Sequence, residues 1–416
     1  MGIGMFSSQP SPIAIDFGSS SLKLLQVSSA EQPELLAAIE IPVPAKIRGD
    51  LDKLMEFYTT EIPPALKKGQ FKGKRCIISL PCQQSTIQHL QLSGITESNI
   101  EELVQSNLQI QLNCMPGSLV TRSFPITSVY RDDQPATEVV TLAIQRELVM
   151  RYVAMLKKCK LATIGVHSEL MAMIRAFDHL NRRESDKDTS TLYVDFGWSA
   201  TRVAIAHGSN LVFARAMALG GRDLDLHIAE RHHCDLAAAR SQRLSLATHT
   251  TSNGVASHST NGMAVFNAGL AKGRMTSVAR QPEQGGIAVH DDRRVGEIAP
   301  ALRHSIDSNG SASPVDELSL NDVIDTMTDE LSMCVRYHDG LFPGRNIDRV
   351  VMVGGEARQS WLCRTLVKSL RLPGQLGDPL ARLVFSSHSS VTGLTFGQPQ
   401  PGWAVACGLT ACPTDL

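Results

Sequence analysis

Two stretches of the chain, residues 13–27 and 192–206, share one pattern of apolar and polar positions. In each, two short apolar runs flank an Asp-Phe-Gly sequence and a turn that carries hydroxyl side chains. This pattern is typical of two strands joined by a tight turn. A third strand is predicted after each hairpin, at residues 35–43 and 210–218. The spacing is too long for a solenoid repeat, so we interpret it as the duplication of a whole domain.

Apolar residues at helical spacing predict most of the remaining elements. Alternation over residues 74–92, interrupted at Pro81, predicts strands, and the polar residues 182–190 link the two halves. A buried strand at residues 349–353 leads into Gly354-Gly355 and a helix that continues through residue 370. The other predicted helices are residues 50–68, 97–112, 146–159, 169–181, 320–337 and 402–411.

Residues 245–313 differ in character from the rest of the chain. Ser, Thr, Asn, Gly, His and Arg dominate there, and the apolar periodicity disappears. So little apolar surface does not offset the entropy lost when a segment becomes ordered. We therefore predict a mostly disordered insertion, with a small folded subdomain as the alternative.

Composition narrows the class of protein. The 416 residues include 40 Lys and Arg and 41 Asp and Glu, for a net charge of −1. This balance argues against a protein that grips nucleic acid or an anionic membrane, since both require clustered positive charge. The nine cysteines include no C-x-x-C pair, which favours a reducing compartment. Without a signal peptide or an apolar run long enough for a bilayer, we expect a soluble cytoplasmic protein with no direct membrane insertion.

The repeated turn suggests phosphate chemistry. Backbone N–H groups of a tight turn can cradle phosphate oxygens, and Gly18 or Gly197 lets the backbone approach closely. The carboxylate of Asp16 or Asp195 beside such a cradle can hold Mg²⁺ through water. A single copy also fits an ordinary glycine turn between two strands. Two copies, one at the start of each half, are more specific evidence for phosphate binding. The strand that ends at Gly354-Gly355 fits a backbone laid against a nucleobase or sugar, or simply a packed strand before a helix.

Together, these three elements in this order resemble the nucleotide fingerprint of the actin-like ATPase superfamily, which also includes sugar kinases and the seventy-kilodalton heat-shock chaperones. Within it the chain is similar to the PilM family, cytoplasmic actin-like proteins of type IV pilus assembly. The likeness covers nearly the whole chain except residues 245–313. The segments that carry it are residues 15–24, 77–82, 146–153, 165–169, 195–197, 220–224, 353–357, 378–379 and 406–409.

The resemblance implies a fold and a domain organisation. The fold class is α/β, a duplicated actin-like (ribonuclease H-like) fold whose two lobes each have a mixed five-stranded sheet. The first lobe comprises residues 10–190, with a core and a small domain inserted at about 80–165. The second lobe comprises residues 191–416 and carries the 245–313 insertion. ATP and Mg²⁺ are expected in the cleft between the lobes.

The resemblance also implies roles for individual residues. Asp16 and Asp195 would lie near the Mg²⁺. Glu169 falls where chaperone-like members carry the acid that orients the attacking water, so Glu169 and Asp195 are the catalytic candidates. The alternative for Glu169 is an acidic residue that the dipole favours at a helix N-terminus. The residues expected to contact the nucleotide are Gly18, Ser19, Ser20, Ser21, Lys23, Gly197, Gly220, Gly221, Gly354 and Gly355.

One segment departs from the family pattern. PilM-like proteins usually carry Ala-Glu-x-x-Lys on the helix that contacts the ribose, whereas this chain has Ala-Ala-Arg-Ser-Gln-Arg at residues 238–243. This segment therefore lacks an acidic side chain that could accept hydrogen bonds from the ribose hydroxyls. The chain resembles ATP-binding members at its phosphate turns more closely than at its ribose helix.

The resemblance implies a partner as well. For PilM-like proteins this is PilN, an inner-membrane protein whose N-terminal cytoplasmic peptide binds a groove around residues 80–165. The protein would thus be peripheral to the inner membrane through its partner, with self-association and ATP hydrolysis left open. The alternatives are a sugar-kinase-like phosphotransferase, which needs a carboxylate base near a substrate hydroxyl, and an FtsA-like cytoskeletal protein. Residues 411–416 carry no amphipathic helix of the kind that would tether the latter.

Overall fold

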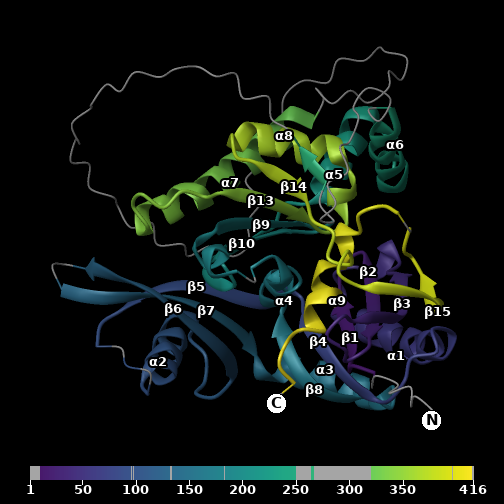
Figure 1. Ribbon diagram of the computed structural model, residues 1–416, viewed down its shortest axis with the longest axis horizontal. Helices are drawn as coiled ribbons and strands as arrows, with labels where there is room; N and C mark the ends of the chain where they lie inside the picture. The colour runs from purple at the N-terminus through teal and green to yellow at the C-terminus, as the bar shows by residue number, and fades with distance from the viewer. Residues whose placement is uncertain are drawn as a thin grey trace, which may run out of the picture. The chain divides into compact units, whose positions relative to one another are not determined.

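The computed structural model describes residues 10–94, 96, 98–131, 134–181, 183–249, 264–266, 320–395 and 397–414. Its first half is built on a six-stranded sheet with the order β15-β3-β2-β1-β4-β8 (Figure 1). The strands β1 and β2 form the predicted hairpin, and β4 runs parallel to β1. The bounds are Ile13–Phe17 (β1), Ser21–Val27 (β2), Glu34–Pro42 (β3), Arg75–Leu80 (β4), Ala162–Ser168 (β8) and Val384–Thr392 (β15).

The second half repeats this arrangement in the order β11-β10-β9-β13-β14-β12. Here β9 and β10 form the second predicted hairpin, and β13 runs parallel to β9 as β4 does to β1. The matching order of five strands in each sheet confirms the predicted duplication. The bounds are Ser190–Phe196 (β9), Thr201–His207 (β10), Asn210–Met217 (β11), Ala264–Phe266 (β12), Arg349–Val353 (β13) and Gly374–Leu376 (β14).

Each sheet has a sixth strand beyond the five expected. In the first sheet β15 pairs in parallel with β3, although the two strands lie near opposite ends of the chain. In the second, β12 pairs antiparallel with β14. The strand β12 falls inside the predicted insertion at 245–313, and the preceding helix continues to His249. Within the predicted insertion, residues 245–249 are therefore helical and residues 264–266 form a strand, and its other residues lie outside the described part of the chain.

A small domain is inserted between β4 and the helix α3. It consists of a three-stranded sheet with the order β5-β7-β6 and one helix, α2. Its own apolar core includes Leu90, Val104, Leu108 and Val139. The helix begins at Ile100 rather than at the predicted residue 97. The bounds are Ser85–Leu92 (β5), Ile100–Leu112 (α2), Leu119–Arg131 (β6), Gln134–Gln145 (β7) and Arg146–Lys158 (α3).

Helices cover both faces of the first sheet. Along β1, Ile13, Ile15 and Phe17 face α1 (Leu51–Lys68) and α3, whereas Ala14 faces α9 (Ala404–Leu409). Because successive side chains of a strand point to opposite faces, a sheet covered on both sides requires apolar residues at every position. This explains why the strands read as continuous apolar runs.

Two helices join the halves. The helix α4 (Glu169–Arg175) follows β8 of the first sheet, yet Met173 and Ile174 pack against Tyr193 and other residues of the second sheet. Conversely, α9 comes late in the chain and packs against β1, β2 and β4 of the first sheet. The two helices also contact each other (Figure 1). The helix α4 is shorter than the predicted 169–181, since it ends at Arg175 and a 3-10 turn follows at Asp178–Leu180.

Four further helices belong to the second half. Apolar residues such as Leu224, Met327 and Leu366 pack from these helices onto the second sheet. Among the described helices, none combines the length and the apolar character that crossing a bilayer requires. Their bounds are Gly221–His232 (α5), Leu236–His249 (α6), Asn321–Leu341 (α7) and Ser360–Leu370 (α8).

Candidate functional site

The predicted turns of both halves line one polar cavity of about 100 Å³. The β1–β2 turn, the β9–β10 turn and the Gly354-Gly355 turn after β13 all contribute to its wall. The start of α9 closes another side with Ala404 and Val405. Of the sequence-predicted residues, the following line the cavity: Asp16, Gly18, Ser19, Ser20, Ser21, Lys23, Glu169, Asp195, Gly197, Gly354 and Gly355. Gly220 and Gly221 are not among the lining residues.

Close backbone packing explains several of these glycines. Gly354 has a φ of +96°, and a Cβ there would lie 2.4 Å from Asp195 Oδ1. A Cβ on Gly220 would lie 2.6 Å from the carbonyl oxygens of Gly197 and Trp198. Gly220 therefore packs behind the β9–β10 turn, and Gly221 packs against the side chain of Glu356 while its N–H donates to the Gly197 carbonyl. At Gly355, in contrast, a Cβ would have no neighbouring atom within 4 Å.

The duplication extends to the charged residues of the two hairpins. Asp16 is paired in register with Lys23, and Asp195 is paired in register with Arg202. Lys23 Nζ lies 3.9 Å from Asp16 Oδ2, whereas Arg202 Nη2 lies 3.0 Å from Asp195 Oδ2. Sequence reasoning missed Arg202, although its position relative to Asp195 repeats that of Lys23 relative to Asp16.

Glu169 lies at the first turn of α4, where Ser168 caps the helix by accepting a hydrogen bond from the Met171 N–H. Its Oε2 accepts a 2.6 Å hydrogen bond from the backbone N–H of Cys82. Its Oε1 accepts a 2.5 Å hydrogen bond from Arg202 Nη1. Both oxygens of this carboxylate thus have protein partners.

Burial is the main influence on the pKa of Asp16. It raises the pKa of this carboxyl to about 6, against the lowering influence of Lys23. The folded state therefore binds more protons than the unfolded state between the unfolded pKa near 3.8 and pH 6. Asp16 reduces stability as the pH rises through this window, and the reduction is complete above it. Ionisable groups held at such a cost cluster at functional sites.

We accordingly expect the substitution Asp16→Asn to stabilise the protein at pH 7.5 by on the order of 2 kcal/mol. The gain should shrink as the pH falls from 6 and approach zero only below the unfolded pKa near 3.8, where the wild-type carboxyl is protonated in both states. Urea unfolding of both proteins at several pH values measures this difference. An unchanged or growing gain at low pH would contradict the assignment.

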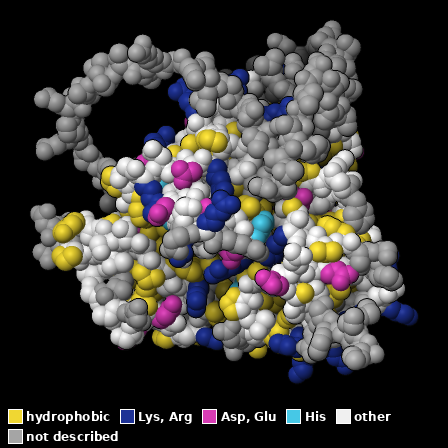
Figure 2. Space-filling view, viewed as in Figure 1, with side chains coloured by type: hydrophobic (Ala, Val, Ile, Leu, Met, Phe, Trp, Pro, Cys, Tyr) yellow, Lys and Arg dark blue, Asp and Glu magenta, His cyan; other side chains and the backbone are white. Residues whose placement is uncertain are grey.

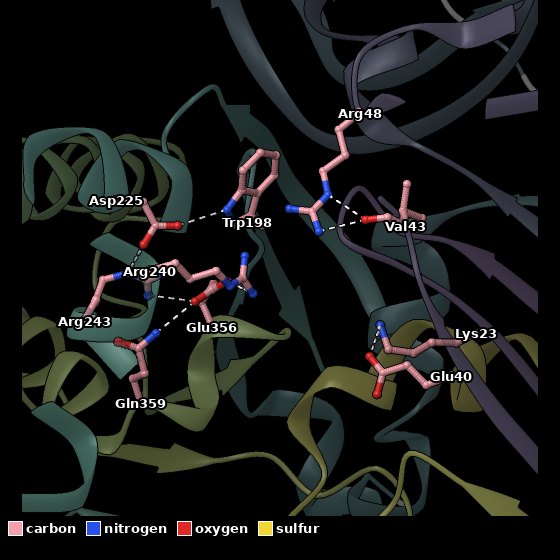
Figure 3. A network of polar contacts seen from close by, with 10 residues as sticks. All are labelled: Lys23, Glu40, Val43, Arg48, Trp198, Asp225, Arg240, Arg243, Glu356 and Gln359. Atoms are coloured by element: carbon pink, nitrogen blue, oxygen red, sulfur yellow. Dashed lines mark hydrogen bonds and ion pairs between the residues drawn. The ribbon is translucent and has the colours of Figure 1, made fainter. Parts of the chain in front are cut away.

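A second polar cluster in the second half adjoins the cavity, whose wall includes its members Arg240 and Glu356 (Figure 3). The fully buried Arg243 of α6 donates hydrogen bonds to Asp225 at 2.6 Å and to Glu356 at 2.8 Å. Arg240 Nη2 lies 3.4 Å from Glu356 Oε1. These two arginines stand in the segment where the family pattern has an acidic residue. Their carboxylate partners come from α5 and from the turn after Gly355, which the sequence did not connect to that helix.

Near this cluster, a cationic side chain of the first half, Arg48, contacts an aromatic side chain of the second half, Trp198. The guanidinium carbon of Arg48 lies 4.5 Å from the centroid of the Trp198 ring. Arg48 also donates two hydrogen bonds to the Val43 carbonyl, and Trp198 Nε1 donates one to Asp225 (Figure 3). The contact therefore links the loop after β3 to the β9–β10 turn.

The donor set does not suit the Mg²⁺ expected on Asp16 and Asp195. Mg²⁺ requires near-octahedral oxygen ligands, whereas Asp195 and Glu169 already share the guanidinium of Arg202. In the described part of the chain, no group of three or more His, Cys, Asp or Glu side chains could hold a metal ion. On the face shown in Figure 2, basic and acidic side chains lie intermixed near the middle of the view.

The matching sheets, the helices that pack across them and the shared cavity define an α/β protein of the actin-like class. A solved structure described as a PilM-PilN type IV pilus biogenesis complex contains a chain with a similar fold, at a TM-score of 0.67 and 16% sequence identity. The match covers 96% of this chain and 97% of that chain. A family model described as type IV pilus assembly protein PilM matches residues 14–248. This chain therefore belongs to the PilM family, and the expected actin-like fold is confirmed.

Weaker likenesses involve two other proteins. The ethanolamine utilization protein EutJ from Carboxydothermus hydrogenoformans matches at a TM-score of 0.46 and 10% identity, over 97% of this chain and 89% of that chain. MreB5 of Spiroplasma citri bound to ADP matches at 0.42 and 12% identity, over 96% and 94%.

Proposed function

We propose that this protein is a cytoplasmic scaffold of type IV pilus assembly, or of a related secretion apparatus. It binds ATP between its two halves and the N-terminal peptide of a PilN-like inner-membrane protein on its first half. Membership of the PilM family supports the assignment to pilus assembly. The solved chain of similar fold comes from a PilM-PilN complex, which supports the partner.

One observation carries the nucleotide part of the proposal: three separate glycine turns line the same cavity. Ser19, Ser20, Ser21 and Lys23 supply hydroxyl groups and a point charge for phosphate oxygens. Gly355 leaves open space for the nucleoside, since no atom approaches its side-chain position. Gly220 and Gly221 would act indirectly, by supporting the β9–β10 turn.

The size of the cavity implies movement. Ligand pockets usually measure about 300–1,000 Å³, so a cavity of about 100 Å³ is too small for ATP. Binding therefore requires the turns of the two halves to separate. A ligand shifts such an equilibrium only through its different affinity for the two states, and this supplies a means by which the nucleotide could influence partner binding.

Exposed apolar side chains of the first half support the proposed peptide site. Met115 is 77% exposed, and Met150 of α3 is 57% exposed. Backbone and side-chain hydrogen bonds from Arg146 to the carbonyls of Ser118 and Gly117 join the first turn of α3 to the loop after α2. We name Leu112, Met115, Val120 and Met150 the apolar surface; these exposed residues come from α2, the loop after it, β6 and α3. Self-association through this surface is the competing use.

The proposal is tested by titrating a fluorescent N-terminal PilN peptide into the protein with and without ATP. The substitution Met150→Lys should weaken peptide binding by at least about tenfold, or about 1.4 kcal/mol, because it places a charge in the apolar contact. Met333→Lys is the matched control, since Met333 is 38% exposed on α7 of the second half. It should bind the peptide like the wild type.

Equal weakening by both substitutions would contradict the peptide surface. Thermal shift with ATP, run alongside, tests the nucleotide part by itself. Hexose-dependent release of ADP, without any effect of the peptide, would instead favour a sugar-kinase-like phosphotransferase.

A further inference from the structure

Arg202 occupies an unusual place in the cavity wall. It lies on β10, with only 9% of its surface exposed. Its Nη2 and Nη1 contact Asp195 and Glu169 respectively, so one guanidinium bridges two buried carboxylates. Its Nε–H has no hydrogen-bond partner within the described residues. The side chain nevertheless forms part of the cavity wall, so its positive charge lies next to the space where an anionic ligand would bind.

The backbone is built to hold this guanidinium. A Cβ on Gly197 would lie 3.1 Å from Arg202 Nη2, closer than ordinary contact. In the first hairpin, a Cβ on Gly18 would lie 3.9 Å from Lys23 Nζ, an ordinary contact, and in both hairpins a Cβ would lie 2.8 Å from a carbonyl oxygen of the turn. Each Asp-Phe-Gly turn thus leaves room for one cation from the neighbouring strand, and the duplication has placed two fixed cations in one cavity.

The two carboxylates that Arg202 bridges are the ones on which a metal-dependent site would rely. Asp195 was expected to bind Mg²⁺ through water, and Glu169 to orient the attacking water. Arginine is always charged and presents its donors in a rigid fork that matches carboxylates. A metal ion that took these ligands would leave the buried guanidinium without its partners, and breaking a buried pair is strongly destabilising.

We propose that Arg202 is a resident cation that takes the place of the divalent metal ion, so that this protein binds nucleotide without a metal site of its own. The inference rests on the proposed nucleotide site but concerns which positive charge faces the phosphates. It follows that Mg²⁺ does not strengthen nucleotide binding. It also follows that Glu169 and Asp195 hold Arg202 rather than a water molecule.

Two measurements test this. The first is the binding of Mn²⁺, as a spectroscopic probe for Mg²⁺, to the nucleotide-free protein by electron paramagnetic resonance. The second is the affinity for a fluorescent ATP analogue, in EDTA and in excess Mg²⁺. In the wild type we expect no Mn²⁺ site. We also expect EDTA to weaken nucleotide binding by less than about fivefold, the lower end of ordinary coupling between ligands.

The substitution Arg202→Gln should expose the carboxylates and create a Mn²⁺ site. The double substitution Arg202→Gln with Glu169→Gln should lose that site again. Arg358→Gln is the matched control, because Arg358 lines the same cavity but is 46% exposed and pairs with Glu40. It should leave the protein without a Mn²⁺ site.

A Mn²⁺ site in the wild type, or a loss of ATP affinity in EDTA well above fivefold, would overturn the inference. If Arg202→Gln does not fold, the two wild-type measurements decide the question alone. If the wild type binds no nucleotide in either condition, the nucleotide part of the proposed function fails. The Mn²⁺ measurement then still decides whether Arg202 excludes a metal ion.

Discussion

Replacing Gly408 by alanine will destabilise this protein by about 3 kcal/mol or more, the upper end of overpacking effects. Gly408 lies in α9 where that helix crosses α4. A Cβ there would lie 1.6 Å from the carbonyl oxygen of Ala172 and 2.5 Å from its carbonyl carbon. Backbone atoms cannot move aside as a flexible side chain can, so the two helices must separate. Because α4 and α9 pack across the two sheets, the effect should extend to the whole cooperative unit.

Urea unfolding followed by circular dichroism measures this effect. Gly340→Ala is the matched control, since Gly340 also lies in a helix, α7, but is exposed and has nothing within 4 Å of its Cβ position. Alanine there should stabilise the protein by about 0.5–1 kcal/mol, because glycine loses more conformational entropy in a helix. Equal unfolding midpoints for Gly408→Ala and the wild type would show that the helices do not cross this closely.

The substitution Arg243→Met should lower the free energy of unfolding by about 3–5 kcal/mol. Arg243 is completely buried, and its guanidinium is hydrogen-bonded to both Asp225 and Glu356. Methionine fills a similar volume but leaves two buried carboxylates without this cation. The loss therefore comes from uncompensated charge rather than from a cavity.

Arg240→Met provides the comparison within the same helix. Arg240 is 31% exposed, and its contact with Glu356 is 3.4 Å long. Since partly exposed ion pairs contribute little, its loss should be below about 1 kcal/mol. Thermal and urea unfolding of the two variants separate the predictions. Similar losses at both positions would mean that the buried cluster does not hold α6 to the turn after Gly355.

Short-range patterns were sufficient for much of the fold. Both hairpins were predicted because apolar runs around a glycine turn determine strand, turn and strand within about 15 residues. The strand β13 was predicted for the same reason. The pairing of β15 with β3 was not predicted, because it joins segments near opposite ends of the chain. Strands β6 and β7 had no predicted counterpart, and β6 carries Pro125, which weakens the strand pattern.

The candidate site divides in a similar way. Asp16, Asp195 and the two Asp-Phe-Gly turns were identified from sequence, and the structure brings them to one cavity. Arg202 was missed because a basic residue on a strand gives no local indication of which carboxylates it will meet. Arg240 and Arg243 appeared only as a departure from a family pattern, since their partners Asp225 and Glu356 belong to other elements.

The repeated hairpin, the strand β13 and the motifs of the PilM family can thus be read from the linear chain, because each depends on neighbouring residues. The pairing of charged side chains, in contrast, depends on distances between residues that are far apart in that chain. Only the folded protein places Arg202 between Asp195 and Glu169. Burial then gives that ion pair its strength, because charges removed from water interact strongly and are costly to separate.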